Sequence, residues 1–206
     1  KEFKKMKSKE YQKVKSYYAE EENELGYQFH FTDKLLNAVA DKVFRIKKML
    51  PDHGRISYQL LEPEVKVEVD NLVKYILSNH KELQHLVDEY VNSKMKLATM
   101  YGGTDDYLKS KRKVYEKEAE KIIANRVLGM IRTLNAKDYD EIKLSKDISK
   151  REFLVTQMLY SAMDMLHSNT QKRNNAFDDF VNGSKELSKE AKKELYLKYQ
   201  DKGYEH

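Results

Sequence analysis

The stretch from Thr32 to Pro51, TDKLLNAVADKVFRIKKMLP, decides the fold class. Its apolar residues recur at three- and four-residue intervals, which places them on one face of an α-helix. They are Leu35, Leu36, Val39, Val43, Ile46, Met49 and Leu50. Thr32 is a residue type that caps the first turn, and Pro51 cannot continue a helix. We therefore predict an amphipathic helix between these two residues.

The same spacing continues beyond a turn-rich connector, PDHGRISY, at residues 51–58. Pro63 is suited to the first turn of a helix, and the apolar period then runs from Val65 to Leu97. The triplet Ser78-Asn79-His80 interrupts it, so that one bent helix and two separate helices both fit the pattern.

Gly102-Gly103-Thr104-Asp105 combines helix-ending glycines with helix-capping residues, and it predicts a helix end followed by a new helix. The new helix is expected to reach about Asn135. After a short segment around Tyr139, residues 153–166 form the most apolar helical pattern in the chain. We expect that helix at the centre of a bundle.

The composition agrees with these patterns. Only 7 Gly and 2 Pro interrupt 206 residues, and a charged fraction of 35% with a mean hydropathy of −0.84 suits helices with narrow apolar stripes. We predict an all-α, elongated helical bundle of about five to eight helices without significant β-sheet. Its expected parts are a basic leader or connecting helix at 1–24, a bundle core at 25–170, and a loosely packed helical tail at 171–206. The apolar positions of the tail are Phe177, Phe180, Val181, Leu187, Leu195 and Leu197.

The net charge of +5 resides in the first 15 residues. Residues 1–15 hold the basic residues Lys1, Lys4, Lys5, Lys7, Lys9, Lys13 and Lys15 against Glu2 and Glu10, and residues 16–206 are neutral overall. Global charge therefore gives no support to nucleic-acid binding, which must come from the leader or from a local basic surface.

One such local surface follows Asp105. Lys109, Lys113, Lys117 and Lys121 recur every four residues, which aligns them along one side of a helix, and Arg112 lies beside them. This row can track DNA phosphates. It can equally be a solvated face that neighbouring glutamates balance.

Motifs for catalysis, metal binding or cofactor binding are absent from the sequence. The chain has no cysteine, its six histidines show no zinc-binding spacing, and Gly102-Gly103 lacks the residues of a phosphate-binding loop. Tyr17-Tyr18 is the pair to consider for tyrosine attack on DNA, but that chemistry needs a histidine-bound metal. We expect no catalytic residue, no metal and no cofactor, and we interpret the 15 tyrosines as packing residues.

Two further features concern the cellular setting. No apolar run approaches the roughly 20 residues of a membrane span, and no apolar segment follows the charged start as in a signal peptide. With no disulfide-forming residue, we expect a cytoplasmic protein that does not insert into a membrane. Because the chain begins with Lys1, we also expect it to be part of a larger protein.

Two stretches resemble a known family: GRISYQLLEPEVKVEVDNLVKYIL at Gly54–Leu77 and MYGGTDDYLKSKRKVYEKEAEKIIANRVLGMIRTL at Met100–Leu134. The first has a small connector, an aromatic, a proline and then a helix with Val-Asp character. The second has a Tyr-Gly turn before a helix rich in Tyr, Lys and Arg. Together they resemble the helical region downstream of the catalytic domain in MobL-type relaxases, the mobilisation proteins of Gram-positive conjugative plasmids and transposons.

The resemblance implies a parent protein that nicks one DNA strand through a tyrosine in a separate N-terminal domain. No position of this chain matches the family's catalytic residues, so the resemblance implies a non-catalytic region. That region would hold DNA beside the origin of transfer, through Lys109, Arg112, Lys113, Lys117 and Lys121, or would dock relaxosome or coupling proteins. The alternative is an all-helical protein-interaction or scaffolding domain with no nucleic-acid role.

Overall fold

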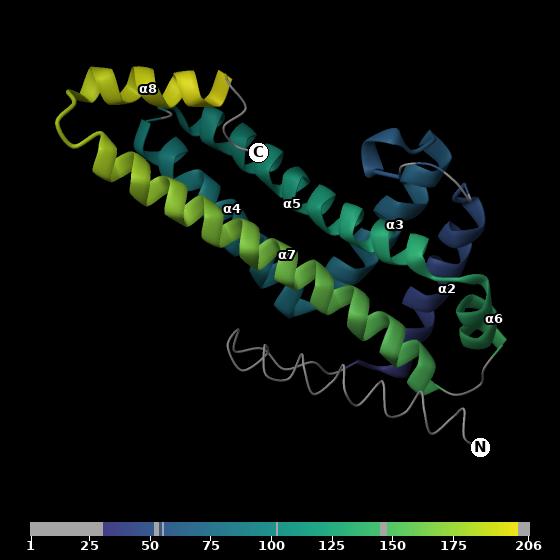
Figure 1. Cartoon of the computed structure of the whole chain (residues 1–206). Helices are drawn as coiled ribbons and strands as arrows, with labels where there is room; N and C mark the ends of the chain where they lie inside the picture. The colour runs from purple at the N-terminus through teal and green to yellow at the C-terminus, as the bar shows by residue number, and fades with distance from the viewer. Residues whose placement is uncertain (1–30, 52–53, 55, 102, 145–147, 202–206) are drawn as a thin grey trace. The chain divides into compact units, whose positions relative to one another are not determined.

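The computed structural model describes residues 31–51, 54, 56–101, 103–144 and 148–201. These residues form seven α-helices and one 3-10 helix, with no strand among them, which confirms the all-α prediction. The α-helices are labelled in Figure 1 as α2 (Asp33–Met49), α3 (Pro63–Asn79), α4 (Lys81–Tyr101), α5 (Asp105–Thr133), α6 (Ala136–Leu144), α7 (Ile148–Gly183) and α8 (Lys189–Asp201). The 3-10 helix, η1 (Tyr58–Leu60), lies between α2 and α3 in the chain. The leader at 1–24, including its lysines, lies outside the described residues.

The helix ends follow the local signals in the sequence. Thr32 caps α2 by accepting a 3.1 Å hydrogen bond from the Leu35 backbone N–H, and Pro63 occupies the first turn of α3. Gly103 takes a φ of +90°, which an L side chain rarely adopts, and the next residue, Thr104, accepts a hydrogen bond from the Tyr107 N–H at the start of α5. Capping chemistry therefore determines where these helices begin and end.

The interruption near residue 80 separates two helices. His80 has extended backbone angles, and its Nδ1 accepts a 3.1 Å hydrogen bond from the Leu83 N–H, as an N-cap side chain does. The imidazole is buried, and its ring centroid lies 5.8 Å from that of Phe31. A histidine thus serves as the cap of α4.

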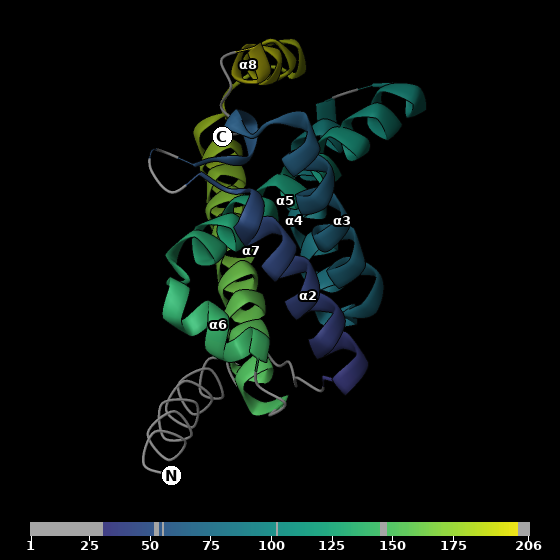
Figure 2. The same ribbon diagram turned by 90° about the vertical axis from the view of Figure 1, so that its right-hand side faces the viewer.

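The chain divides into two compact units, which are described separately. The first comprises Lys1–Gln84 and Ile123–Met163. Within it α2 packs against α3, as Figure 2 shows, and α6 also contacts α2. The largest fully buried side chains of this unit are Leu36, Ile46, Leu72, Ile76, Leu83, Ile123, Leu128, Ile131, Met158 and Leu159.

The second unit comprises His85–Ile122 and Asp164–His206. It contains most of α4, the first part of α5, the last part of α7 and all of α8. The predicted boundary between residues 170 and 171 falls inside α7 and not at a helix end. Polar side chains in this stretch bond to their own helix, because Thr170 Oγ1 donates to the Leu166 carbonyl and Asn169 donates to the Met165 carbonyl.

The tail also packs through a residue that was not among its expected apolar positions. Leu187 and Leu197 are 40% and 44% exposed, whereas Tyr196 is 2% exposed. Tyr196 contacts both the end of α4 and the start of α5: its ring lies 5.9 Å from Tyr101, and its hydroxyl is 3.1 Å from that of Tyr107. Leu187 and Leu197 therefore contribute little to the packing of the tail, whereas Tyr196 reaches both a ring and a hydroxyl partner.

Candidate nucleic-acid interface

The first part of α5, in the second unit, has a packed face and an outward face. Tyr115 and Ala119 are buried on the packed face. All five predicted phosphate-binding residues are exposed: Lys109, Arg112, Lys113, Lys117 and Lys121. Within the described part of the chain, none of these five side chains forms an ion pair. The structure therefore places the five residues on one accessible helical surface, which we call the outward face of α5.

Not all charged side chains of α5 belong to this outward face. Lys111 and Glu118 turn toward the packed side: the Lys111 ammonium lies 5.9 Å from the Tyr115 ring, and Glu118 pairs with Lys94 of α4. Between residues 109 and 121 the outward face keeps five basic side chains and two acidic ones, Glu116 and Glu120. Its net charge is therefore positive, by three formal charges.

The geometry of the row suits a polyanion. Residues four apart on an α-helix are separated by about 6 Å along its axis, so Lys109 and Lys121 are about 18 Å apart. Double-stranded DNA carries one phosphate per roughly 3.4 Å of each strand. A DNA strand that lies along the row therefore presents several phosphates to these cations.

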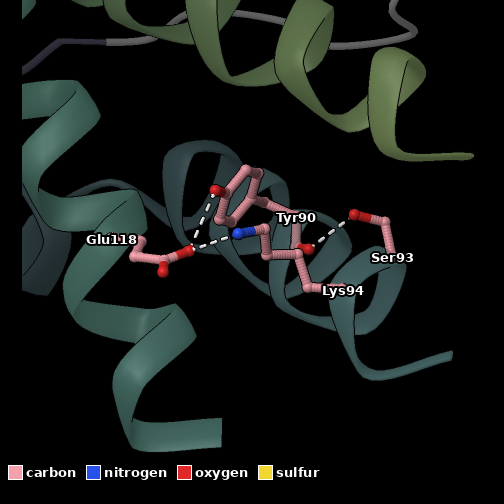
Figure 3. Close-up of polar contacts among 4 residues, drawn as sticks. All are labelled: Tyr90, Ser93, Lys94 and Glu118. Atoms are coloured by element: carbon pink, nitrogen blue, oxygen red, sulfur yellow. Dashed lines mark hydrogen bonds and ion pairs between the residues drawn. The ribbon is translucent and has the colours of Figure 1, made fainter. Parts of the chain in front are cut away.

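A buried ion pair fixes the orientation of α5 in this unit (Figure 3). Lys94 Nζ lies 2.6 Å from Glu118 Oε2, and the Tyr90 hydroxyl donates to the same oxygen at 3.3 Å. The Lys94 side chain is 2% exposed, and its ammonium also lies 5.1 Å from the Tyr115 ring. Carboxylate and aromatic faces both stabilise a buried ammonium. This network holds the Tyr115 side of α5 inward and leaves the lysine row outward.

Sequence reasoning missed this network, although one signal for it was available. Lys94 follows Tyr90 by four residues and Val87 by seven, so it occupies the apolar face of α4. A lysine at such a position needs a partner when it is buried. Glu118 cannot be recognised as that partner from helical spacing, because it belongs to another helix.

The tyrosines that the structure describes near this region act in packing, in agreement with their interpretation from the sequence. Tyr101 contacts Phe180 edge-on at 5.8 Å, and Tyr107 bonds to Tyr196. Tyr17-Tyr18 lies outside the described residues.

No group of three or more His, Asp or Glu residues that could hold a metal ion occurs in the described ranges. Among the same residues, burial lowers the pKa of His80, and the Glu82 carboxylate opposes that effect. The ring is engaged in capping α4. None of the helices described is long and apolar enough to cross a lipid bilayer.

The two stretches that carry the family resemblance meet in the first unit. The Arg132 guanidinium donates hydrogen bonds to the carbonyls of Pro51 and Gly54, at 3.0 and 2.9 Å. Asn125 Oδ1 accepts a 2.8 Å hydrogen bond from the backbone N–H of Tyr58. The last part of α5 therefore contacts the described residues Pro51, Gly54 and Tyr58, which precede α3 in the chain.

Comparison of the chain with protein-family models, with curated proteins and with solved structures finds no match.

Proposed function

We propose that this chain is a non-catalytic helical domain of a DNA relaxase or mobilisation protein, and that the outward face of α5 binds the DNA backbone near an origin of transfer. The observation that carries the DNA-binding part is the set of five exposed basic side chains, with no ion pair to another described residue. The assignment to a mobilisation protein rests on the resemblance of Gly54–Leu77 and Met100–Leu134 to MobL-type relaxases.

The chemistry of this face supports non-specific binding. Lysine ammonium groups contact phosphates as point charges and carry no base-sequence information. Arg112 is the one guanidinium among the five residues. The expected affinity is therefore electrostatic, similar for different base sequences, and strongly dependent on salt.

A second candidate function is docking of relaxosome or coupling proteins, or scaffolding with no DNA role. Large apolar side chains at the surface favour it. In the first unit Leu60 is 67% exposed and Val67 is 56% exposed, and in the second Met100 is 54% exposed. A protein-docking domain of this kind predicts no DNA binding even at low salt.

Fluorescence anisotropy with labelled duplex DNA separates the two candidates. At about 50 mM salt, we expect the double variant Lys113→Glu/Lys117→Glu to bind at least about tenfold more weakly than the unmodified chain, because two phosphate contacts are lost. The matched control is Lys189→Glu/Lys193→Glu on α8, which makes the same charge change at the same spacing on exposed positions. It should retain most of the affinity.

Three results count against the proposal. Absence of binding at low salt refutes it and leaves protein docking as the function. An equal loss of DNA affinity in the α5 variant and the α8 control shows that binding depends on net charge and not on the position of the lysines. Undiminished binding by the α5 variant places the DNA surface elsewhere, for example on the lysine-rich leader.

A further inference from the structure

We infer that the outward face of α5 selects duplex DNA over single-stranded DNA, an inference that rests on the DNA-binding function proposed above. Proteins that bind single strands combine a basic groove with aromatic side chains on which bases stack. Proteins that bind a duplex backbone need cations alone. The position of the aromatic side chains of α5 therefore discriminates between the two forms.

Both tyrosines in the first part of α5 are engaged on its packed side. Tyr115 is 1% exposed, and the ammonium groups of Lys94 and Lys111 lie 5.1 and 5.9 Å from its ring. Tyr107 is half-buried, with its hydroxyl against Tyr196 and Lys111 5.8 Å from its ring. Neither ring is available as a stacking platform beside the lysine row.

The uncharged residues that the outward face does present are small. Ser110 and Val114 are exposed between the lysines, and Val114 is 46% exposed. Neither side chain has a π-face for a base. Unstacked bases of a single strand would therefore gain nothing from this surface beyond the contacts of their phosphates.

Charge density then determines the preference. The slope of log affinity against log salt is about −0.9 per phosphate contact for a duplex and about −0.7 for a single strand. We take the electrostatic contribution to the affinity to vanish near about 1 M salt. With three to five phosphate contacts, the duplex then binds about 6- to 20-fold more tightly than the single strand at about 50 mM salt. The ratio of duplex affinity to single-strand affinity should fall steadily as the salt concentration is raised.

The test is a competition in which unlabelled single-stranded and duplex DNA of equal length and composition displace a labelled duplex from the full chain. The same competition is repeated with the variant Val114→Trp, which places an aromatic ring on the outward face at a sequence position between Lys113 and Lys117. We expect it to raise single-strand affinity by about fivefold or more, with little change for the duplex. Circular dichroism confirms that the helices of this variant are retained.

The outcomes distinguish this inference from the proposed function. A duplex preference that Val114→Trp narrows supports the inference. Equal or tighter single-strand binding that still depends on Lys113 and Lys117 overturns the inference and leaves DNA binding intact. Failure of both DNA forms to bind at low salt refutes the proposed function itself.

Discussion

Replacing Glu118 by Gln tests whether the buried ion pair holds α5 in place. The substitution keeps the shape of the side chain and a carbonyl oxygen that can accept hydrogen bonds, but it removes the charge that lies 2.6 Å from Lys94 Nζ. The Lys94 side chain is only 2% exposed, so water cannot replace the lost carboxylate. The ammonium then remains buried, and a neutral amide oxygen replaces the carboxylate beside its aromatic neighbours.

The magnitude follows from the burial of the two partners. Removing one partner of a fully buried ion pair typically costs about 3–5 kcal/mol. Glu118 is 29% exposed, and the Tyr90 and Tyr115 rings still stabilise the ammonium, so we expect a loss of about 2 kcal/mol. Lys94→Met removes the buried charge and fills a similar volume, and it leaves Glu118 as a carboxylate that is 29% exposed and partly solvated, so it should cost less than Glu118→Gln, about 1 kcal/mol.

Urea unfolding of the two single variants and of the double variant measures these free energies. In the double variant, Glu118→Gln should add little to Lys94→Met, because no buried ammonium remains to lose its partner. If Glu118→Gln lowers the unfolding free energy by no more than Lys94→Met does, the ion pair does not orient α5 and the reasoning fails.

Three other substitutions probe separate parts of the fold. The pKa of His80 is lowered by burial, so near the ordinary value of 6.5 the unfolded state binds a proton more readily than the folded state, and stability should fall as pH drops through that value. His80→Asn keeps an acceptor for the Leu83 N–H and should flatten this pH dependence, which urea unfolding at several pH values measures. An unchanged pH dependence would contradict this. Arg132→Gln removes the hydrogen bonds to Pro51 and Gly54, so it should lower the free energy of unfolding by about 1 kcal/mol and accelerate amide exchange in the residues around Gly54. Unchanged exchange rates would contradict this prediction. Tyr196→Ala should release α8 and make residues 184–201 the first site of proteolysis, whereas unchanged cleavage would show that Tyr196 does not hold the tail.

The helix boundaries were predictable wherever one local signal determined them. Thr32, Pro63 and Thr104 lie at helix starts because a cap or a first-turn proline acts on its own neighbours. The outward position of the lysine row was predictable for the same reason, since helical period decides which residues share a side.

Features that depend on other helices were not predictable. The burial of Lys94 needs Glu118 from α5, and the anchoring of the tail by Tyr196 needs Tyr101 and Tyr107. The continuity of α7 through residue 170 was hidden for a different reason. Its polar side chains look like a loop in sequence, but some of them bond to carbonyls of their own helix, and no Gly or Pro interrupts the stretch.

The salt dependence of duplex binding reports how many phosphates the outward face of α5 contacts. With three to five phosphate contacts on the outward face of α5, the log of the association constant should fall against log salt with a slope of about −2.7 to −4.5. Lys113→Glu/Lys117→Glu should make that slope shallower by about 1.8, because two contacts are lost. An identical slope in the variant and the unmodified chain would show that these lysines contact no phosphate, and the proposed DNA-binding face would have to be abandoned.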